Sequence, residues 1–362
     1  GLNYDLNAMA MLVRDWATES GLGGLRLATF LITDSLNDLH PLVVENPRAS
    51  KLAIALPSAA DLGSAMQVLQ PQFPTALANY QDQLDVPAAQ LTGATLSAIQ
   101  GLLRSKEYRN QSLQDADLAE LKKELVEQDC QGLIEFIEPK RTLDDVYGQE
   151  AIKEWIRQDI ALWQQNDAGA MPMGYLLCGP VGTGKTYMVE CLSGEAGVPV
   201  VKFKNFRDRW VGSTEGNLEK IFSLLHALGR CVVFIDEADQ ALGKRDSGSG
   251  DSGVSGRVYS MMAKEMSDSD NRGKILWILA SSRPDLIEVD LKRPGRVDVK
   301  IPLFPSVTRE EGFFLIRALC KKHRVDLPKT AIERLKPLIP DLVTPGAAES
   351  LAIKVYRLMK TK

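Results

Sequence analysis

The sequence predicts an α/β fold with a mostly parallel sheet, and two observations carry this prediction. From about residue 143 to 305, short apolar runs alternate with stretches of helical periodicity, which is the rhythm of strands joined by crossover helices. Within this region the glycine-rich segment GPVGTGKT (179–186) directly follows the apolar run MGYLLC. A strand, a loop of this type and a helix in succession predict a ligand at the carboxyl ends of the strands.

Residues 1–104 are predicted to be the rear half of a first, degenerate module of the same kind, a sheet remnant with a helical lid. The segment mixes helical patterns with strand-like runs at 25–32 and 51–56. It resembles the C-terminal part of the chain at a constant offset of 248 residues, which pairs Arg48 with Arg296. Chance similarity between two α/β segments is the alternative reading, and we favour duplication.

A helical linker is predicted between this segment and the main module. Residues 112–138 have the pattern of one long amphipathic helix, and Ser112 with Asp115 fits a capping box at its start. The predicted segments after residue 104 are the linker, a large α/β part and a small helical lid: 105–142, 143–305 and 306–362. Five apolar runs are the predicted strands of the sheet: GYLLC (174–178), VPVVKF (198–203), CVVFID (231–236), KILWILA (274–280) and VKIPL (299–303).

Composition excludes several classes of function. Hydrophobic residues make up 44% of the chain, yet no apolar run approaches the roughly 18 residues that a membrane span requires. The net charge of −4 provides no general basic field, so we expect no nucleic-acid partner. The five cysteines are odd in number and widely spaced, which argues against a disulfide framework and favours a reducing compartment such as the cytoplasm.

The glycine-rich segment has the pattern of a phosphate-binding loop. Glycines allow backbone conformations that turn consecutive N–H groups toward an anion, and the following helix adds its positive N-terminal end. Lys185 supplies a point charge for the outer phosphates, and Thr186 offers a hydroxyl to Mg²⁺. The predicted nucleotide-contacting residues of the loop are Pro180, Val181, Gly182, Thr183, Gly184, Lys185 and Thr186.

Two carboxylates end the apolar run CVVFID, fifty residues beyond Thr186. A buried strand that delivers acids at its carboxyl end suits a second ligand for the metal, Asp236, next to a base for the attacking water, Glu237. A buried strand with a solvated acidic end is the structural alternative. The phosphate loop upstream favours the catalytic reading.

The segment SSRPDLIEVDLKRPGRVD adds three candidates. Ser282 follows a predicted strand, within reach of the water or the γ-phosphate, although serine is common in loops. Arg293 and Arg296 are three residues apart in RPGR, where Pro and Gly disfavour a continuous helix. An arginine that reaches a γ-phosphate offsets charge in the transition state. If these two do not reach their own phosphate loop, they serve a nucleotide in a neighbouring subunit, which predicts a ring.

Together these residues resemble a known family. The chain is similar to the AAA (AAA+) ATPases over roughly residues 143–362. The motifs that carry the resemblance are LDDVYGQEAIKEWI, GPVGTGKT, VVFIDEAD, GRVYSMMAKEM and SSRPDLIEVDLKRPGRVD. The resemblance implies a P-loop NTPase module, ATP and Mg²⁺ as ligands, ATP hydrolysis, and a homo-oligomer in the form of a hexameric ring. It further implies a backbone contact to adenine and a contact from the lid, at Val146, Tyr147, Gly148, Gly346 and Ala347.

Two positions depart from the family pattern. Ser282 stands where the family usually has Asn, which shortens the side chain and removes an amide donor. Tyr147 replaces a common Gly, although the contact expected there is made by backbone.

The segment RDRWVGSTEG resembles the pore loop of family members that thread polypeptide. Trp210 and Val211 occupy the aromatic and apolar positions, and a bulky ring supplies contact without asking for a particular partner sequence. An ordinary core Trp is the alternative. A looser resemblance, covering about three quarters of the chain, is to tandem AAA proteins of cyanobacteria and chloroplasts with a degenerate first module. That likeness adds the chloroplast stroma as a possible compartment.

Two functions of different classes follow. The leading hypothesis is a ring that couples ATP hydrolysis to protein remodelling or unfolding past the aromatic pore loop. The alternative is an ATP-gated scaffold or assembly factor with slow turnover, which the Ser282 departure favours. A nucleic-acid motor is disfavoured by the acidic composition, and the protein client is not revealed by the sequence.

Overall fold

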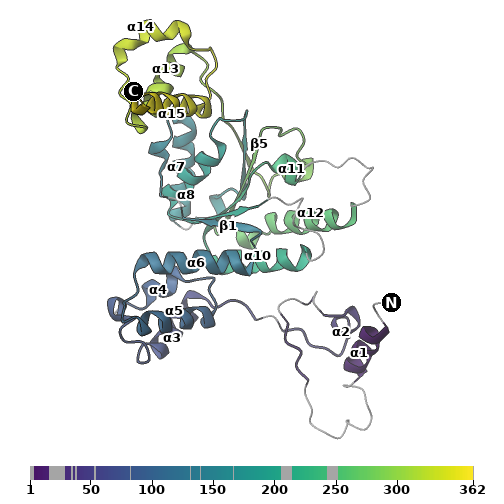
Figure 1. Cartoon of the computed structure of the whole chain (residues 1–362). Coiled ribbons are helices and arrows are strands. Elements are labelled where there is room, and N and C mark those ends of the chain that lie inside the picture. Colours follow the sequence, from purple (N-terminus) through teal and green to yellow (C-terminus); the bar gives the residue numbers. More distant parts are fainter. Residues whose placement is uncertain are drawn as a thin grey trace. The chain divides into compact units, whose positions relative to one another are not determined.

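The computed structural model divides into two compact units, seen in Figure 1. One takes in the described residues within 1–118, 129–131 and 210–227, and the other those within 119–128, 132–209 and 228–362. The residues that the structure describes are 4–15, 29–33, 36, 39–52, 54–81, 83–130, 132–138, 140–165, 167–204, 214–242 and 252–361.

A six-stranded sheet forms the centre of the second unit, and it confirms the predicted fold class. The strand order is β1-β3-β4-β5-β2-β6; β1 is antiparallel to β3, and the other neighbours are parallel. All residues of β4 and β5 are buried, as the continuous apolar runs predict for strands covered on both faces. The strands are β1 Ile134–Ile137, β2 Gly174–Cys178, β3 Val200–Phe203, β4 Cys231–Ile235, β5 Ile275–Ser281 and β6 Val299–Pro302.

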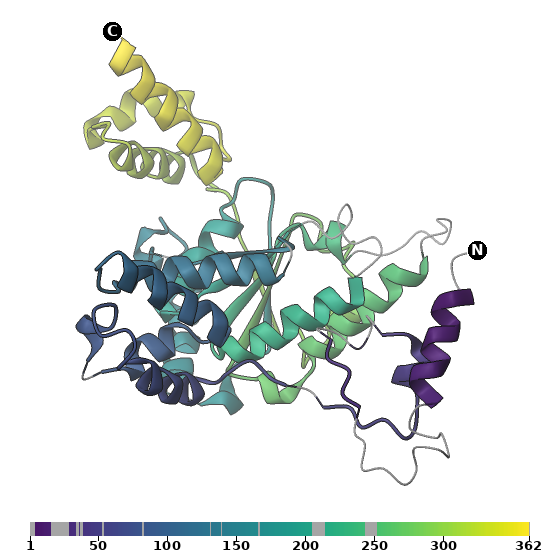
Figure 2. The same ribbon diagram turned by 60° about the horizontal axis from the view of Figure 1, so that its bottom comes forward.

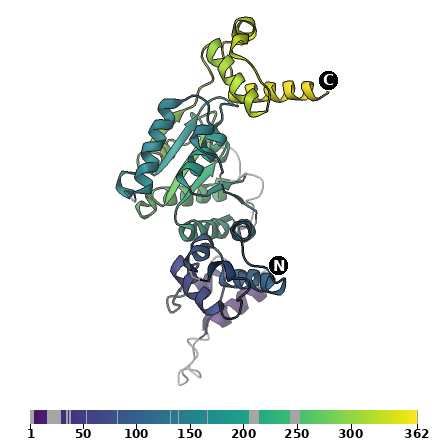
Figure 3. The same cartoon turned by 90° about the vertical axis from the view of Figure 1, so that its left-hand side faces the viewer.

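Helices cover both faces of this sheet. α7 (Glu150–Gln164) and α8 (Lys185–Ala196) lie on one side and α12 (Ser252–Met266) on the other, as Figures 1 and 3 show. α7 directs Ile156, Ile160 and Trp163 into a buried cluster with β-strand side chains such as Tyr175 and Phe234. The second unit also contains α11 Ala238–Ala241 and the 3₁₀ turns η3 Leu143–Asp145, η4 Ala168–Ala170, η5 Ser269–Asn271 and η6 Val289–Lys292. α10 Thr214–Leu228 belongs to the first unit, apart from its last residue.

A small helical group follows β6, as the sequence predicts (Figure 2). Its helices are α13 Arg309–Lys322, α14 Ile332–Leu335 and α15 Pro345–Thr361, with the turns η7 Lys329–Ala331 and η8 Lys336–Leu338. The group has its own core, in which Phe313, Val343 and Ala352 are buried. We refer to residues 306–361 as the lid. Among the described helices of the whole chain, none combines the length and apolar character needed to cross a bilayer.

The described residues of the first unit form helices, and none of them belongs to the two strands predicted there. The described residues of 25–32 and 51–56 are outside any strand, so those strand predictions are wrong for these residues. Phe30 and Ile54 are 84% and 90% exposed there. A strand needs a neighbour for its N–H and C=O groups, and every strand of the described sheet comes from residue 134 onward. The helices are α1 Tyr4–Asp15, α2 Pro41–Val44, α3 Ala59–Leu69, α4 Asp85–Gln90 and α5 Leu96–Tyr108, with the turn η2 Ala78–Tyr80.

The long linker helix predicted over 112–138 is also wrong in its extent. α6 spans Asp115–Asp129, and instead of the Ser112 capping box the Asp117 carboxylate accepts the Gln114 N–H at 3.0 Å. The chain leaves the helix at Gly132, whose φ of 69° favours glycine and whose N–H donates to the Glu127 carbonyl. Residues 134–137 then form the edge strand β1, so part of the expected linker belongs to the sheet.

Candidate nucleotide-binding site

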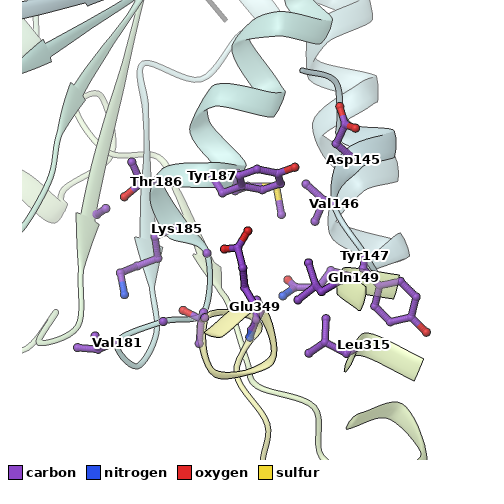
Figure 4. A pocket seen from close by; sticks show the side chains of 18 of the residues that line it. Asp145, Val146, Tyr147, Gln149, Val181, Lys185, Thr186, Tyr187, Leu315 and Glu349 are labelled. Carbon is purple, nitrogen blue, oxygen red and sulfur yellow. The ribbon is translucent and has the colours of Figure 1, made fainter. Parts of the chain in front are cut away.

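A cavity of about 600 Å³ lies at the carboxyl ends of β2, β4 and β5. Its walls come from five places: the loop after β2, the acidic end of β4, the end of β5, the segment before α7 and the lid. Figure 4 shows Lys185 and Thr186 on one side, Val146 and Gln149 on the other, and Glu349 of the lid projecting between them. The volume and the mixture of apolar and charged groups suit a ligand of nucleotide size.

The phosphate loop leads directly into α8. Gly182 and Gly184 have φ values of 84° and 86°, a left-handed conformation that favours glycine. Gly184 is the N-cap of α8 and no side chain caps the helix there, so its first N–H groups remain for a ligand. Gly179 lies so close to β6 that an added Cβ would be 2.2 Å from the Leu303 carbonyl oxygen. These positions explain why the loop needs glycine at these three sites.

Lys185 is held over the loop. Its ammonium donates to the carbonyl oxygens of Gly179 at 2.7 Å and Pro180 at 3.0 Å. Burial lowers the pKa of this ammonium, while the nearby Asp236 carboxylate acts in the opposite direction. A phosphate oxygen is a stronger partner for an ammonium than a neutral carbonyl, so these two contacts are ones that a ligand can replace.

The structure brings the two predicted metal ligands together. The Thr186 hydroxyl donates to the Asp236 carboxylate at 3.1 Å, although fifty residues separate them in sequence. Lys202 lies 3.5 Å from the same carboxylate. A hydroxyl and a carboxylate side by side, at the mouth of a phosphate loop, fit Mg²⁺, which is commonly bound by one or two carboxylates together with substrate phosphates.

Glu237 lines the cavity beside this pair, as predicted for a base. Its backbone is left-handed, with φ 48°, and its N–H donates to the Asp236 carboxylate at 3.0 Å. The side chain is exposed to the cavity and to solvent. A non-glycine residue in this conformation is uncommon, and such strain concentrates at functional sites.

Ser281 is the last residue of β5 and Ser282 follows it; the sequence motifs indicate a role only for Ser282. Ser282 is exposed and lines the cavity. Ser281 is 1% exposed; its hydroxyl donates to the Asp239 carboxylate and accepts the Arg283 N–H at 2.9 Å. This pair of hydrogen bonds fixes the backbone on both sides of Ser282. The only signal for Asp239 in the sequence was its place in IDEAD, three residues after Asp236.

The predicted arginines lie outside the described lining of the cavity. Arg293 and Arg296 both pair with Asp290 of η6, at 3.0 Å for Arg293. The Arg293 side chain is 69% exposed and that of Arg296 is 21% exposed. One carboxylate thus holds both arginines away from the phosphate loop of their own chain.

The segment 146–148, which we call the hinge segment, lies across the cavity from Lys185. Val146 and Tyr147 line the cavity, whereas Gly148 is not among its lining residues. The Tyr147 ring points away from the middle of the cavity in Figure 4, as expected if this residue contacts a base through its backbone. Opposite, the lid reaches the loop directly, because the Gly346 N–H donates to the Gly182 carbonyl at 2.9 Å. Pro180 and Ala347, also predicted to contact nucleotide, are not in the lining.

Several lining residues were missed by sequence reasoning. Tyr187, directly after Thr186, has the Arg141 guanidinium 5.0 Å from its ring centroid and the Lys322 ammonium 5.1 Å from it. Lys322 also pairs with Glu349 at 3.1 Å. A lid lysine over a ring on α8 ties the lid to the phosphate-loop helix. No motif indicates such a contact, because it depends on how lid and sheet pack.

Comparison with known proteins decides the family of this module. Residues 175–304 match the model of the ATPase family associated with various cellular activities (AAA). Residues 175–304 are an AAA ATPase domain. The matched range begins in β2 and ends after β6, so the phosphate loop, the acidic end of β4 and both arginines belong to the AAA domain. The chemistry of such a domain is ATP hydrolysis.

The similarity to characterised relatives centres on the same module. The chain is 31% identical over 185 residues to an ATP-dependent zinc metalloprotease FtsH of Lancefieldella parvula, which covers 49% of this chain and 29% of the relative. It is 32% identical over 200 residues to the peroxisomal ATPase pex6 of Schizosaccharomyces pombe, covering 53% and 21%. It is 33% identical over 180 residues to a cell division cycle protein 48 homolog of Archaeoglobus fulgidus, covering 49% and 22%. The chain therefore spans less than a third of the length of these relatives.

The pore-loop prediction at Trp210 and Val211 falls outside the described residues, and it stays a prediction.

Proposed function

We propose that this chain is a subunit of a ring in which each AAA domain hydrolyses Mg²⁺-ATP with arginines lent by its neighbour. The observation that carries the proposal is the placement of Arg293 and Arg296. Both are held by Asp290, outside the described lining of the cavity that contains Lys185 and Glu237. Such a site has a base and a lysine for the phosphates, but it lacks an arginine that stabilises the transition state. It is complete only when a second chain supplies that arginine.

The residues present account for the steps of hydrolysis. The loop N–H groups and Lys185 bind the β- and γ-phosphates and hold the γ-phosphorus in place. Glu237 accepts the proton of the attacking water, whose oxygen forms the new bond as the bond from phosphorus to the bridging oxygen breaks. Thr186 and Asp236 would hold Mg²⁺, which neutralises phosphate charge when bound. Ser282, which lines the cavity, would donate a hydrogen bond on the γ-phosphate side.

We further propose that the ring remodels protein clients through Trp210. One relative is named an ATP-dependent zinc metalloprotease, which supports an action on proteins, and the RDRWVGSTEG motif supports a polypeptide as the client. A bulky ring can hold extended chains of any sequence by apolar contact.

Replacement of Trp210 with Ala tests this part of the proposal. We expect unfolding of a fluorescent protein with an unstructured tail to fall by about tenfold or more, since a Trp anchor commonly carries that much binding energy. ATP turnover should stay near the wild-type rate. Trp155→Ala is the matched control, because Trp155 is 46% exposed on α7 and lies outside the pore-loop segment RDRWVGSTEG. Equal unfolding by wild type and the Trp210 variant would remove the threading claim.

A slow scaffold is the second candidate, and the end of β5 favours it. Ser282 offers one hydroxyl and no amide, and Ser281 is committed to Asp239 and Arg283. Weak contact to the γ-phosphate would leave ATP bound for long periods, so that nucleotide controls assembly rather than movement. Very slow turnover combined with ATP-dependent assembly, and no unfolding of the tailed protein, would support the scaffold over the motor.

We also propose that residues 1–104 are the rear half of a first, degenerate module, with a structural role. Shifted by 248 residues, α2 falls on η6, α3 on α13, α4 on α14 and η8, and α5 on α15. A common order of elements at a constant offset supports duplication better than a few identities do. An experimental structure in which α3, α4 and α5 pack differently from α13, α14 and α15 would contradict it.

A further inference from the structure

The hinge segment is fixed by one buried lysine. Lys153 is 6% exposed, donates to the Val146 carbonyl at 3.0 Å and pairs with Glu150 at 2.8 Å. In a trans peptide the C=O and the following N–H point to opposite sides, so the Tyr147 N–H points away from Lys153. Within the described part of the chain, that N–H has no acceptor. The hinge segment thus presents a fixed, unused donor where Val146 and Tyr147 line the cavity.

Gln149 follows the hinge segment, and its side chain makes no hydrogen bond to the described residues. It precedes α7 in a left-handed conformation with φ 59°, yet its side chain does not cap the helix. Its Oε1 is buried and has no hydrogen-bond partner among those residues. An unpaired buried acceptor is costly, and an uncommon backbone conformation beside it adds to that cost. Both costs are accounted for if the carboxamide serves a ligand.

The Gln149 carboxamide lies where the base of a nucleotide would be. Gln149 lines the cavity, and in Figure 4 its amide points toward Glu349, on the side opposite Lys185 and Thr186. Leu315 of the lid lies on this side in Figure 4, and Leu315 and Leu319 both add apolar surface to the cavity lining. The last torsion of a Gln side chain has broad preferences, so a small rotation turns either amide atom to a ligand.

A carboxamide distinguishes purines by their six-position. Adenine has an amino group, which donates, beside a ring nitrogen, which accepts, so it can pair with the C=O and the NH₂ of one carboxamide. A 6-oxo purine has an acceptor in place of the amino group. We propose that Gln149 selects a 6-aminopurine base, in addition to any contact from the hinge backbone. This inference rests on the proposed binding of ATP in this cavity.

The test is the affinity for three triphosphates, measured by calorimetry in the Glu237→Gln background, in which we expect turnover to be strongly reduced. ATP is compared with purine riboside triphosphate, which lacks the 6-amino group, and with GTP. We expect the preference for ATP over purine riboside triphosphate to be about tenfold, and to fall close to one in Gln149→Met. Gln149→Glu keeps an acceptor for the amino group, so it should retain more of the preference than Gln149→Met.

Gln165→Met is the control, because Gln165 is exposed at the other end of α7 and should leave the preference unchanged. If ATP binds and Gln149→Met keeps the full preference, this inference fails and the proposed function stands. The inference also fails, with the proposed function intact, if the folded Gln149→Glu variant discriminates less than Gln149→Met. If none of the three nucleotides binds to the chain that retains Gln149, the proposed function fails and the inference fails with it.

Discussion

Glu237→Gln is expected to lower ATP turnover by roughly 10²- to 10⁴-fold while ATP binding persists, because a general base contributes about that factor. The amide keeps the size of the side chain and cannot take the proton of the water. The backbone arrangement at this position does not depend on the carboxylate, since it is the Glu237 N–H that donates to Asp236. Steady-state phosphate release and equilibrium ATP binding measure the two quantities separately.

Glu333→Gln is the matched control for this variant. Glu333 is exposed on α14 and lies outside the cavity, so the same chemical change there should leave turnover unaltered. Turnover within about twofold of wild type in Glu237→Gln would exclude Glu237 as the base.

Arg293→Ala is expected to lower turnover by about 10³-fold or more, because arginines that stabilise the transferring phosphoryl group are worth roughly 10³ to 10⁵ in rate. ATP affinity should change little, since Arg293 is not in the described lining of its own cavity. Arg296→Ala would be a less direct test than Arg293→Ala. It is more buried than Arg293 and also donates to the Asp290 carbonyl, so its removal disturbs η6 as well.

Mixing two inactive variants shows whether the arginine acts in the site of a neighbouring chain or in the site of its own chain. Arg293→Ala has an intact base and no arginine to lend, whereas Glu237→Gln has the arginine and no base. A mixed ring contains sites with both groups, so the mixture should recover part of the wild-type turnover. Arg309→Ala serves as control, since Arg309 is likewise an exposed arginine paired with an aspartate. No recovery in mixed assemblies would place the arginine in its own site or outside catalysis.

The parts of the site that were predictable are local in sequence. GPVGTGKT combines its glycines, lysine and threonine within eight residues, and Asp236 and Glu237 directly follow a continuous apolar strand. Strands buried on both faces, such as β4 and β5, stand out because their apolar runs do not alternate. Such features need no knowledge of the tertiary structure.

The parts that were not predictable depend on distant contacts. The sequence predicts a helix that includes β1, because Ile134, Phe136 and Ile137 are apolar and suit either structure, and only pairing with β3 decides between them. The strand-like runs at 25–32 and 51–56 show the opposite error, since apolar residues alone do not form a strand without a neighbour. Gln149 lies in the motif LDDVYGQEAIKEWI, but an uncharged side chain gives no sign of a role until the cavity around it is known.

The central claim is that one chain does not complete the hydrolytic site. The most direct measurement is ATP turnover per chain across a dilution series, with the oligomeric mass of each sample determined by light scattering. We predict that turnover per chain falls with the fraction of assembled rings, by about 10³-fold or more in the monomer. Full turnover in samples that contain only monomer would contradict the account.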